Sequence, residues 1–219
     1  MRAGLRGALL AATAVVLAAC GSDTGAGVDP LAALPPLADF PVGYSMIGAP
    51  ESFDSALPGV GDRMAFDEER CRKLIEPPAG PGAGESVSSG MGSAVYLVYV
   101  VDTEQSVGDF ADAVRECEVI SASSQRQTLA LTRGTAPDVG PDAVGYRYVG
   151  TQGVRADGQQ LVDTPMVQER LVGQVGDWLV TASVTVLSRT GEAVTEAQIR
   201  PESEVLRTVF DRTIEWLGS

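Results

Sequence analysis

The sequence contains no histidine and only one lysine, Lys73, in 219 residues. Histidine is the commonest general base and the commonest protein ligand for metals, so its absence excludes serine–histidine, cysteine–histidine and histidine-bound zinc hydrolases. A serine–lysine mechanism would depend on Lys73, which lies in a charged stretch without a Ser-x-x-Lys motif. We therefore expect Lys73 to be a solvated residue near the end of a helix.

Basic residues are scarce as well. Lys and Arg together number 16, against 29 Asp and Glu. A surface that binds nucleic acid needs clustered Lys and Arg to neutralise phosphates, whereas the arginines of this chain are scattered singly. This composition excludes nucleic acid as the expected partner.

The amino-terminal residues have the composition of a secretory signal. Arg2 and Arg6 precede an uncharged, apolar run over residues 7–19, which is the order found in signal peptides. A membrane-spanning helix needs ~20 apolar residues, so this run is too short to cross a bilayer. It ends in Leu-Ala-Ala-Cys-Gly at residues 17–21, which resembles the lipobox of bacterial lipoproteins. Cleavage after residue 19 would leave Cys20 lipidated (palmitoylated); the alternative is an ordinary signal peptide with a chance cysteine.

The residues after this site predict a tether and one domain. Residues 20–36 are rich in Gly, Ala, Asp and Pro, which favours a flexible tether, and residues 37–219 suffice for a single domain with a core. Removal of the signal would leave 14 basic and 29 acidic residues, a net charge of −15. This charge should keep the protein from binding anionic head groups electrostatically, so membrane attachment would depend on the lipid at Cys20.

Acylation of Cys20 leaves two thiols, Cys71 and Cys117. Export places them in an oxidising compartment, where we expect them to form a disulfide. The alternatives are two free thiols or half of a zinc site, and the zinc site lacks further ligands because the chain has no histidine and no third free thiol.

Local patterns in the first half of the domain predict two helices and a strand. Opposite charges at its two ends favour a short helix over residues 67–75, followed by a Gly/Ser/Pro-rich loop over 79–93. Residues 94–101 are apolar on both faces, which is typical of a buried strand. Residues 107–118 predict an amphipathic helix that turns Cys117 inward.

The second half predicts strands and a final helix. Short apolar runs indicate strands over residues 128–132, 144–149, 167–175 and 178–187. Gly176-Asp177 separates the last two and suits a two-residue hairpin turn. Pro201 is expected to begin a helix that runs to residue 217 with an apolar stripe. The predicted fold is α+β: a single antiparallel sheet with helices packed on it, one disulfide, and a lipoprotein signal and tether before it.

Carboxylates are the remaining candidates for catalysis or metal binding. Two acids at a suitable separation suffice for glycoside cleavage, and the candidate pairs are Asp102 with Glu104 and Asp138 with Asp142. All four stand beside turn residues, where acids are expected for local hydrogen bonding. Residues 137–142 lack the ligand pattern of a calcium loop, and residues 80–92 lack the Gly-Lys-Ser/Thr of a phosphate loop. We expect no catalytic residue, metal or cofactor.

The aromatic residues are few and lie on predicted elements. Most are expected to pack in the core, although Tyr and Trp also line ligand grooves; they are Tyr96, Tyr99, Tyr146, Tyr148, Trp178 and Trp216.

Residues 34–45, with the sequence LPPLADFPVGYS, are similar to the opening of a family of actinobacterial sensor-domain lipoproteins. Cys71 in the first helix, Cys117 at the end of the next helix, and a late hairpin over residues 171–186 resemble the extracellular sensor domain of the mycobacterial kinase PknH and its lipoprotein relatives. The resemblance covers about residues 34–217. It implies an extracytoplasmic binding or sensing module, and it implies no particular ligand.

The sequence therefore predicts a non-enzymatic envelope lipoprotein, anchored through Cys20 on the outer face of the cell membrane, that binds an unknown ligand or envelope protein. One alternative is a carrier or chaperone for envelope lipid, which would need an apolar cavity well above the ~300–1,000 Å³ of ordinary pockets. A second alternative is a hydrolase built on two carboxylates.

Overall fold

The computed structural model describes residues 29–54, 64–89, 93–155 and 162–219. The predicted signal peptide (1–19), the acylation site Cys20 and the first part of the predicted tether lie outside these ranges, so they remain predictions. Ala33 and Leu34, in the last part of the predicted tether, are buried in the hydrophobic core.

Ten antiparallel strands form a single sheet in the order β1-β4-β5-β10-β9-β8-β7-β6-β3, with β2 also paired to β4. The strands are β1 (Tyr44–Met46), β2 (Glu51–Phe53), β3 (Ala65–Phe66), β4 (Gly82–Ser89), β5 (Ala94–Asp102), β6 (Val119–Ser123), β7 (Gln127–Arg133), β8 (Ala143–Val154), β9 (Val162–Val175) and β10 (Trp178–Leu187). The predicted antiparallel α+β fold is confirmed.

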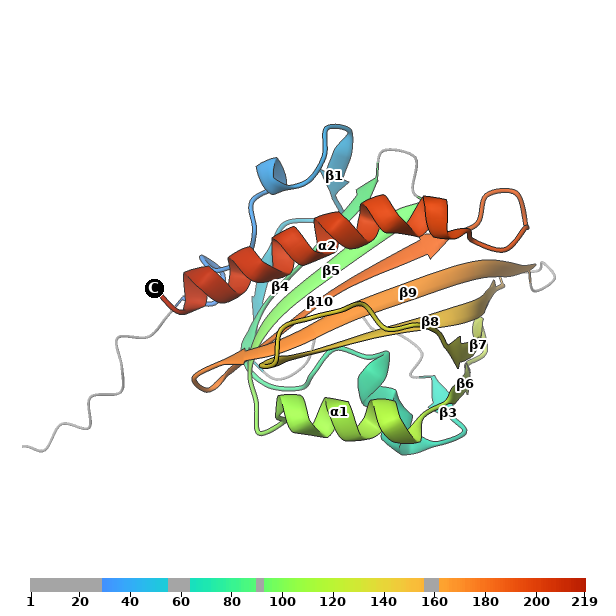
Figure 1. Cartoon of the computed structure of the whole chain (residues 1–219), viewed down its shortest axis with the longest axis horizontal. Coiled ribbons are helices and arrows are strands. Elements are labelled where there is room, and N and C mark those ends of the chain that lie inside the picture. The colour runs from blue at the N-terminus through green and yellow to red at the C-terminus, as the bar shows by residue number, and fades with distance from the viewer. Residues whose placement is uncertain (1–28, 55–63, 90–92, 156–161) are drawn as a thin grey trace, which may run out of the picture.

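Helices cover both faces of the sheet. Figure 1 shows α2 lying across one face and α1 below the other face. The helices are the 3-10 helices η1 (Leu37–Asp39) and η2 (Glu69–Leu74) and the α-helices α1 (Val107–Glu116) and α2 (Glu196–Leu217). The side of α2 that faces the sheet buries Leu206, Val209 and Phe210 against β5, β9 and β10, while α1 buries Phe110 and Ala113 on the opposite side.

The hairpin of β9 and β10 lies at the centre of the sheet, as its position in the strand order shows. Val175 and Trp178 are paired across the turn, and Gly176 has a φ of 58°. A positive φ is what the first central residue of a tight hairpin turn requires. The hairpin predicted from Gly176-Asp177 is therefore confirmed.

The prediction that α2 begins at Pro201 is wrong. The helix begins at Glu196, five residues earlier, because Thr195 caps it. The Thr195 amide donates to Gln198 Oε1 at 2.8 Å, which is half of a capping box. Pro201 therefore lies inside the helix, where it cannot donate a hydrogen bond to the carbonyl oxygen four residues earlier.

The prediction of a loop over residues 79–93 is also wrong, because most of it is strand β4. Glycine and serine have low strand propensity, yet packing here requires small residues. Gly84 is paired with Tyr99, and a Cβ at Gly84 would lie 2.4 Å from the Tyr99 ring. Gly84 thus leaves room for the ring on one face of the sheet. The short strands β1, β2, β3 and β6 had no signal of their own in the sequence.

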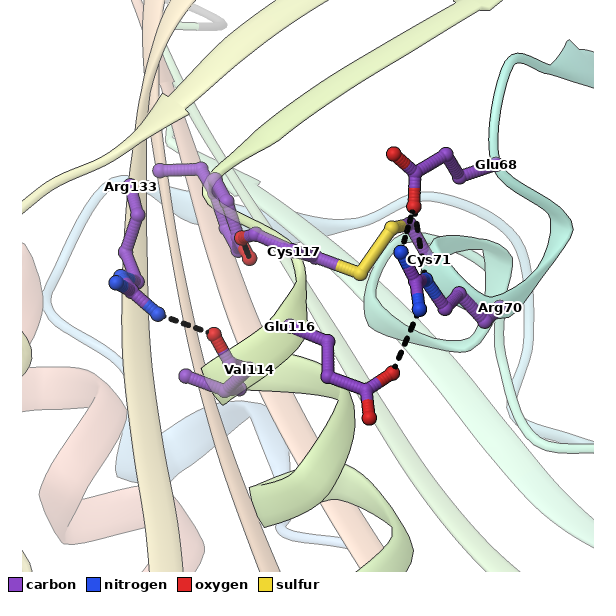
Figure 2. Close-up of a disulfide and its surroundings, with 8 residues drawn as sticks. Glu68, Arg70, Cys71, Val114, Glu116, Cys117 and Arg133 are labelled. Carbon is purple, nitrogen blue, oxygen red and sulfur yellow. Dashed lines mark hydrogen bonds and ion pairs between the residues drawn. A yellow bond between two sulfur atoms is a disulfide. The ribbon is translucent and has the colours of Figure 1, made fainter.

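A disulfide joins η2 to the end of α1. Cys71 and Cys117 are both buried, and their Cα atoms lie 5.9 Å apart. Figure 2 shows an ion pair beside it, in which Arg70 Nη1 of η2 donates to Glu116 Oε2 of α1 at 3.1 Å. The predicted pairing is confirmed, and it ties η2 to α1 on the same face of the sheet.

Arg170 of β9 holds the end of η2 against the sheet. Its side chain is fully buried, and its guanidinium donates to the carbonyl oxygens of Ile75 at 2.8 Å and Glu76 at 3.0 Å. These carbonyls follow the end of η2, where helical carbonyls lack partners and a cation is favourable. Tyr146 adds a hydrogen bond to the carbonyl oxygen of Leu74 at 3.0 Å. The end of η2 is therefore held on the sheet by two buried side chains.

Candidate functional site

A groove runs between α2 and the connection that joins β7 to β8, residues 134–142, above β8 and β9. This connection folds back along β8, as the golden segment beside β8 in Figure 1 shows. The Gly134 amide donates to the carbonyl oxygen of Arg147 at 2.8 Å. Gly145 allows the close approach, since a Cβ there would lie 3.0 Å from Pro137. We call the space between this connection and α2 the α2 groove.

One section of the α2 groove, the apolar section, has a volume of about 450 Å³. Leu171 of β9, Phe210 and Ile214 of α2, and Val139 of the connection line it with apolar side chains. Carboxylates contribute as well, from Asp142, Asp211 and Glu215. The section therefore combines an apolar surface with several acidic groups.

The second section, the charged section, has a volume of about 400 Å³. Arg147 of β8 pairs there with Glu169 of β9 and, at 2.8 Å, with Glu196 of α2. The Glu169 side chain is 1% exposed whereas that of Glu196 is 68% exposed. A buried pair keeps its geometry because breaking it would leave an uncompensated charge. An exposed pair contributes little and is easily exchanged.

Arg207 of α2 separates the two sections. Its guanidinium donates to the backbone carbonyl oxygen of Asp138 in the connection, and Arg207 lines both sections together with Leu171. This exposed hydrogen bond joins the two walls of the groove. Both volumes lie within the ordinary range for ligand pockets, ~300–1,000 Å³. Neither section is a cavity of the size that a lipid carrier would need.

A second polar cluster lies on the α2 face of the sheet, away from the groove. Glu85 of β4 is 5% exposed, and neither of its carboxylate oxygens has a hydrogen-bond partner among the described residues. Burial, and to a smaller extent the nearby Asp39 carboxylate, raise the pKa of Glu85 to about 7. Asp39 itself pairs with Arg212 of α2. Near neutral pH, Glu85 therefore changes charge inside the fold.

Two tyrosines fix the amino-terminal segment to α2. The hydroxyls of Tyr44 and Tyr96 donate to Glu202 Oε2 at 2.6 and 2.5 Å. Burial and the Glu202 carboxylate raise the pKa of Tyr44 to about 12, so this hydroxyl remains a donor at physiological pH. Phe40 packs edge-on against Tyr96. These contacts tie residues near η1 and β1 to the helix that forms one wall of the groove.

The two carboxylate pairs suggested by the sequence lie in different parts of the fold. Asp102 and Glu104 line one shallow depression beside the β9–β10 turn, together with Asp177. Asp142 lines the apolar section of the α2 groove, while Asp138 contributes its backbone oxygen to Arg207. The described residues contain no group of three or more Cys, Asp or Glu positioned to hold a metal ion.

Other residues considered from the sequence are structural. Lys73 lies in η2, and residues 82–89 of the glycine-rich stretch form β4. The four strand tyrosines are buried in the two faces of the sheet, and none of them lines either section of the groove. Trp178 is half-buried and Trp216 is 36% exposed. The sequence did not indicate Arg147, Glu169 or Glu85, because buried ionisable residues on strands have no local signature.

Comparison with known proteins identifies the fold. No protein-family model matches the chain, and no curated protein matches it. The extracellular domain of PknH from Mycobacterium tuberculosis is similar over 84% of this chain and 94% of its own, with 9% identity and a TM-score of 0.50. An uncharacterised protein from Mycobacterium smegmatis, the Rv0999 ortholog, is similar over 85% and 96%, with 14% identity and a TM-score of 0.48. The similarity to the PknH domain shows that the chain has a fold like that of the PknH extracellular domain, as the resemblance predicted.

No helix within the described ranges is both long enough and apolar enough to cross a bilayer.

Proposed function

We propose that this sensor-domain fold serves a membrane-anchored extracytoplasmic module, attached through acylated Cys20, that binds a ligand or partner in the α2 groove without catalysing a reaction. The observation that carries the proposal is the groove itself, which joins an apolar section of about 450 Å³ to a charged section of about 400 Å³. Its fold similarity to an extracellular domain supports the location outside the membrane.

The two sections suit an amphipathic ligand or a peptide segment with both apolar and polar groups. Leu171, Phe210 and Ile214 offer apolar contact area, which supplies most of the binding free energy in such sites. Arg147 is held in place by buried Glu169, while its second partner, Glu196, is exposed. An acidic group of a ligand can therefore replace Glu196 on Arg147 at little cost.

A carboxylate hydrolase is not supported by this arrangement. General acid catalysis requires one protonated carboxyl, whose pKa is raised above its usual value. In the charged section the carboxylates of Glu169 and Glu196 both pair with the guanidinium of Arg147, and the Glu169 side chain is 1% exposed, which keeps its carboxylate out of reach of a substrate. The groove therefore supports binding better than glycoside cleavage.

The anchor is tested by the variant Cys20→Ala. The lipobox residue supplies the acylated thiol in this proposal, so the variant should lose its fatty acid and leave the membrane fraction. Detergent phase partition of cells that express each form measures this, and mass spectrometry of the amino-terminal peptide identifies the acyl group. If Cys20→Ala remained in the detergent phase, the chain would be held by something other than this lipid.

The groove is tested by the variant Ala143→Trp. Ala143 lines the apolar section, so an indole there should fill it and exclude a ligand. Native mass spectrometry of protein purified from its own envelope should show a bound molecule on the unchanged protein and none on this variant. Ala136→Trp is the matched control, because Ala136 is exposed in the same connection and lines neither section. Equal retention by both variants would place the binding site elsewhere.

A further inference from the structure

The surface formed by residues 31–50 differs in composition from the rest of this acidic protein. The segment contains a single charged residue, Asp39. The Asp39 side chain is only 8% exposed and pairs with Arg212 of α2. Of the side chains that are exposed along this segment, only that of Ser45 is polar. The segment thus presents a surface without an exposed carboxylate, in a chain with 29 acidic residues.

The exposed side chains of this segment are largely aliphatic. Leu31, Leu37, Val42 and Ile47 are 38%, 40%, 105% and 52% exposed, and they are four of the nine large hydrophobic residues exposed in the described ranges. A clustered apolar surface on a soluble domain marks contact with a membrane or with another protein. Single exposed aliphatic residues need no such explanation, but four within one short segment do.

The fold holds this segment in a fixed position. Tyr44 to Met46 form β1, which pairs with β4 at the edge of the sheet. Phe40 is buried in the core, and Asp39 and Tyr44 are bonded to α2 through Arg212 and Glu202. In Figure 1 the blue segment that leads into β1 lies along the upper edge of the sheet, beside α2. The aliphatic side chains are therefore presented by a supported surface rather than by a loose tail.

The attachment point lies close to this surface along the chain. Cys20 precedes the first described residue, Asp29, by nine residues. Nine fully extended residues span at most roughly 30 Å, so an acyl chain at Cys20 keeps the segment within reach of the bilayer. The segment has no lysine or arginine, which leaves apolar contact as its means of binding lipid.

We propose that residues 31–50 form a bilayer-docking surface, which rests its aliphatic side chains in the lipid to which Cys20 anchors the chain. The inference rests on the lipid anchor proposed above. It adds an orientation: the edge of the sheet that carries β1 and β4 faces the membrane, and the α2 groove, which lies over β8 and β9, is displaced from it across the sheet. Because the contact is apolar, it should persist at high salt.

The test uses the full lipidated protein in phosphatidylcholine vesicles whose acyl chains carry bromine, which quenches tryptophan at short range. Val42→Trp places the reporter at the most exposed of the four aliphatic side chains, and Ala136→Trp places a matched reporter beside the α2 groove. Emission from Val42→Trp, corrected for that of the unchanged protein, should be lost in brominated vesicles and retained in ordinary ones. Emission from Ala136→Trp should be retained in both.

A second set of substitutions tests whether quenching depends on the aliphatic side chains of the segment and not only on the new tryptophan. Leu37→Asp and Ile47→Asp, introduced together with Val42→Trp, should restore emission in brominated vesicles, with thermal unfolding measured to confirm that the variant is folded. If the protein floats with the vesicles but Val42→Trp is not quenched, the docking surface is overturned while the anchor stands. If the protein does not float with vesicles, the anchor fails and this inference fails with it.

Discussion

Replacing Cys71 and Cys117 together by Ala is expected to lower the free energy of unfolding by about 4 kcal/mol. The disulfide closes a loop with a sequence separation of 46, and most of its effect comes from restricting the unfolded chain. A loss of this size is a large share of the ~5–15 kcal/mol that stabilises an ordinary domain. Urea unfolding at fixed pH, followed by tryptophan fluorescence, measures it.

The control for this prediction is the ion pair beside the disulfide. Glu116→Gln removes the partner of Arg70 across the same two helices but leaves the covalent bond. Both side chains are more than half exposed, so this variant should lose far less stability than the double cysteine variant. If the two variants were equally stable, the disulfide would contribute little, and Arg170 and Tyr146 would suffice to hold η2 on the sheet.

Replacing Glu85 by Gln is expected to stabilise the protein above pH 7 by roughly 3 kcal/mol and to have little effect below pH 4.5. The pKa of Glu85 rises from 4.5 to about 7 on folding, first because of burial and then because of Asp39. The folded state therefore binds the proton more tightly than the unfolded state does. Stability from this group is fully present below pH 4.5 and is lost as the pH rises to 7.

The control replaces an exposed carboxylate near Glu85 that is not one of its charged neighbours. Asp39 of η1 is the carboxylate that acts on it, and Arg212 of α2 pairs with Asp39. Glu51→Gln is a suitable comparison, because Glu51 is exposed on β2, which pairs with β4 opposite Gly84. Unfolding free energies at pH 4.5 and pH 8 should show a smaller fall for Glu85→Gln than for the unchanged protein or Glu51→Gln. Equal falls in all three would show that Glu85 ionises without cost.

Local patterns in the sequence were sufficient to predict the elements whose signals are confined to a few residues. Gly176 at the turn was enough to predict the β9–β10 hairpin, and the apolar spacing that turns Cys117 inward was enough to predict α1. Both follow from the periods of strands and helices and from the φ that a turn requires. Pro201 predicts a start of α2 five residues too late, because the cap formed by Thr195 and Gln198 begins the helix at Glu196.

Strand β4 shows where local propensity fails. Its glycines and serines indicate a loop, yet β1, β2 and β5 supply backbone partners, and Gly84 makes room for Tyr99. Tertiary contacts of this kind routinely override β-propensity. The short strands β1, β3 and β6 are defined in the same way, by neighbours that are distant in the sequence.

What the sequence determined by itself is chemical: without histidine it excludes histidine-based reactions, its few basic residues predict that nucleic acid is not a partner, and the expected acylation of Cys20 leaves Cys71 and Cys117 as the pair for the disulfide. Only the tertiary structure decided where charge is buried and where apolar surface is exposed. The α2 groove, the burial of Glu85 and the attachment of the amino-terminal segment depend on contacts such as that of Tyr44 with Glu202, 158 residues apart. Residue type and local periodicity do not record such pairings, because the free energy of each depends on which distant side chains exclude water from it.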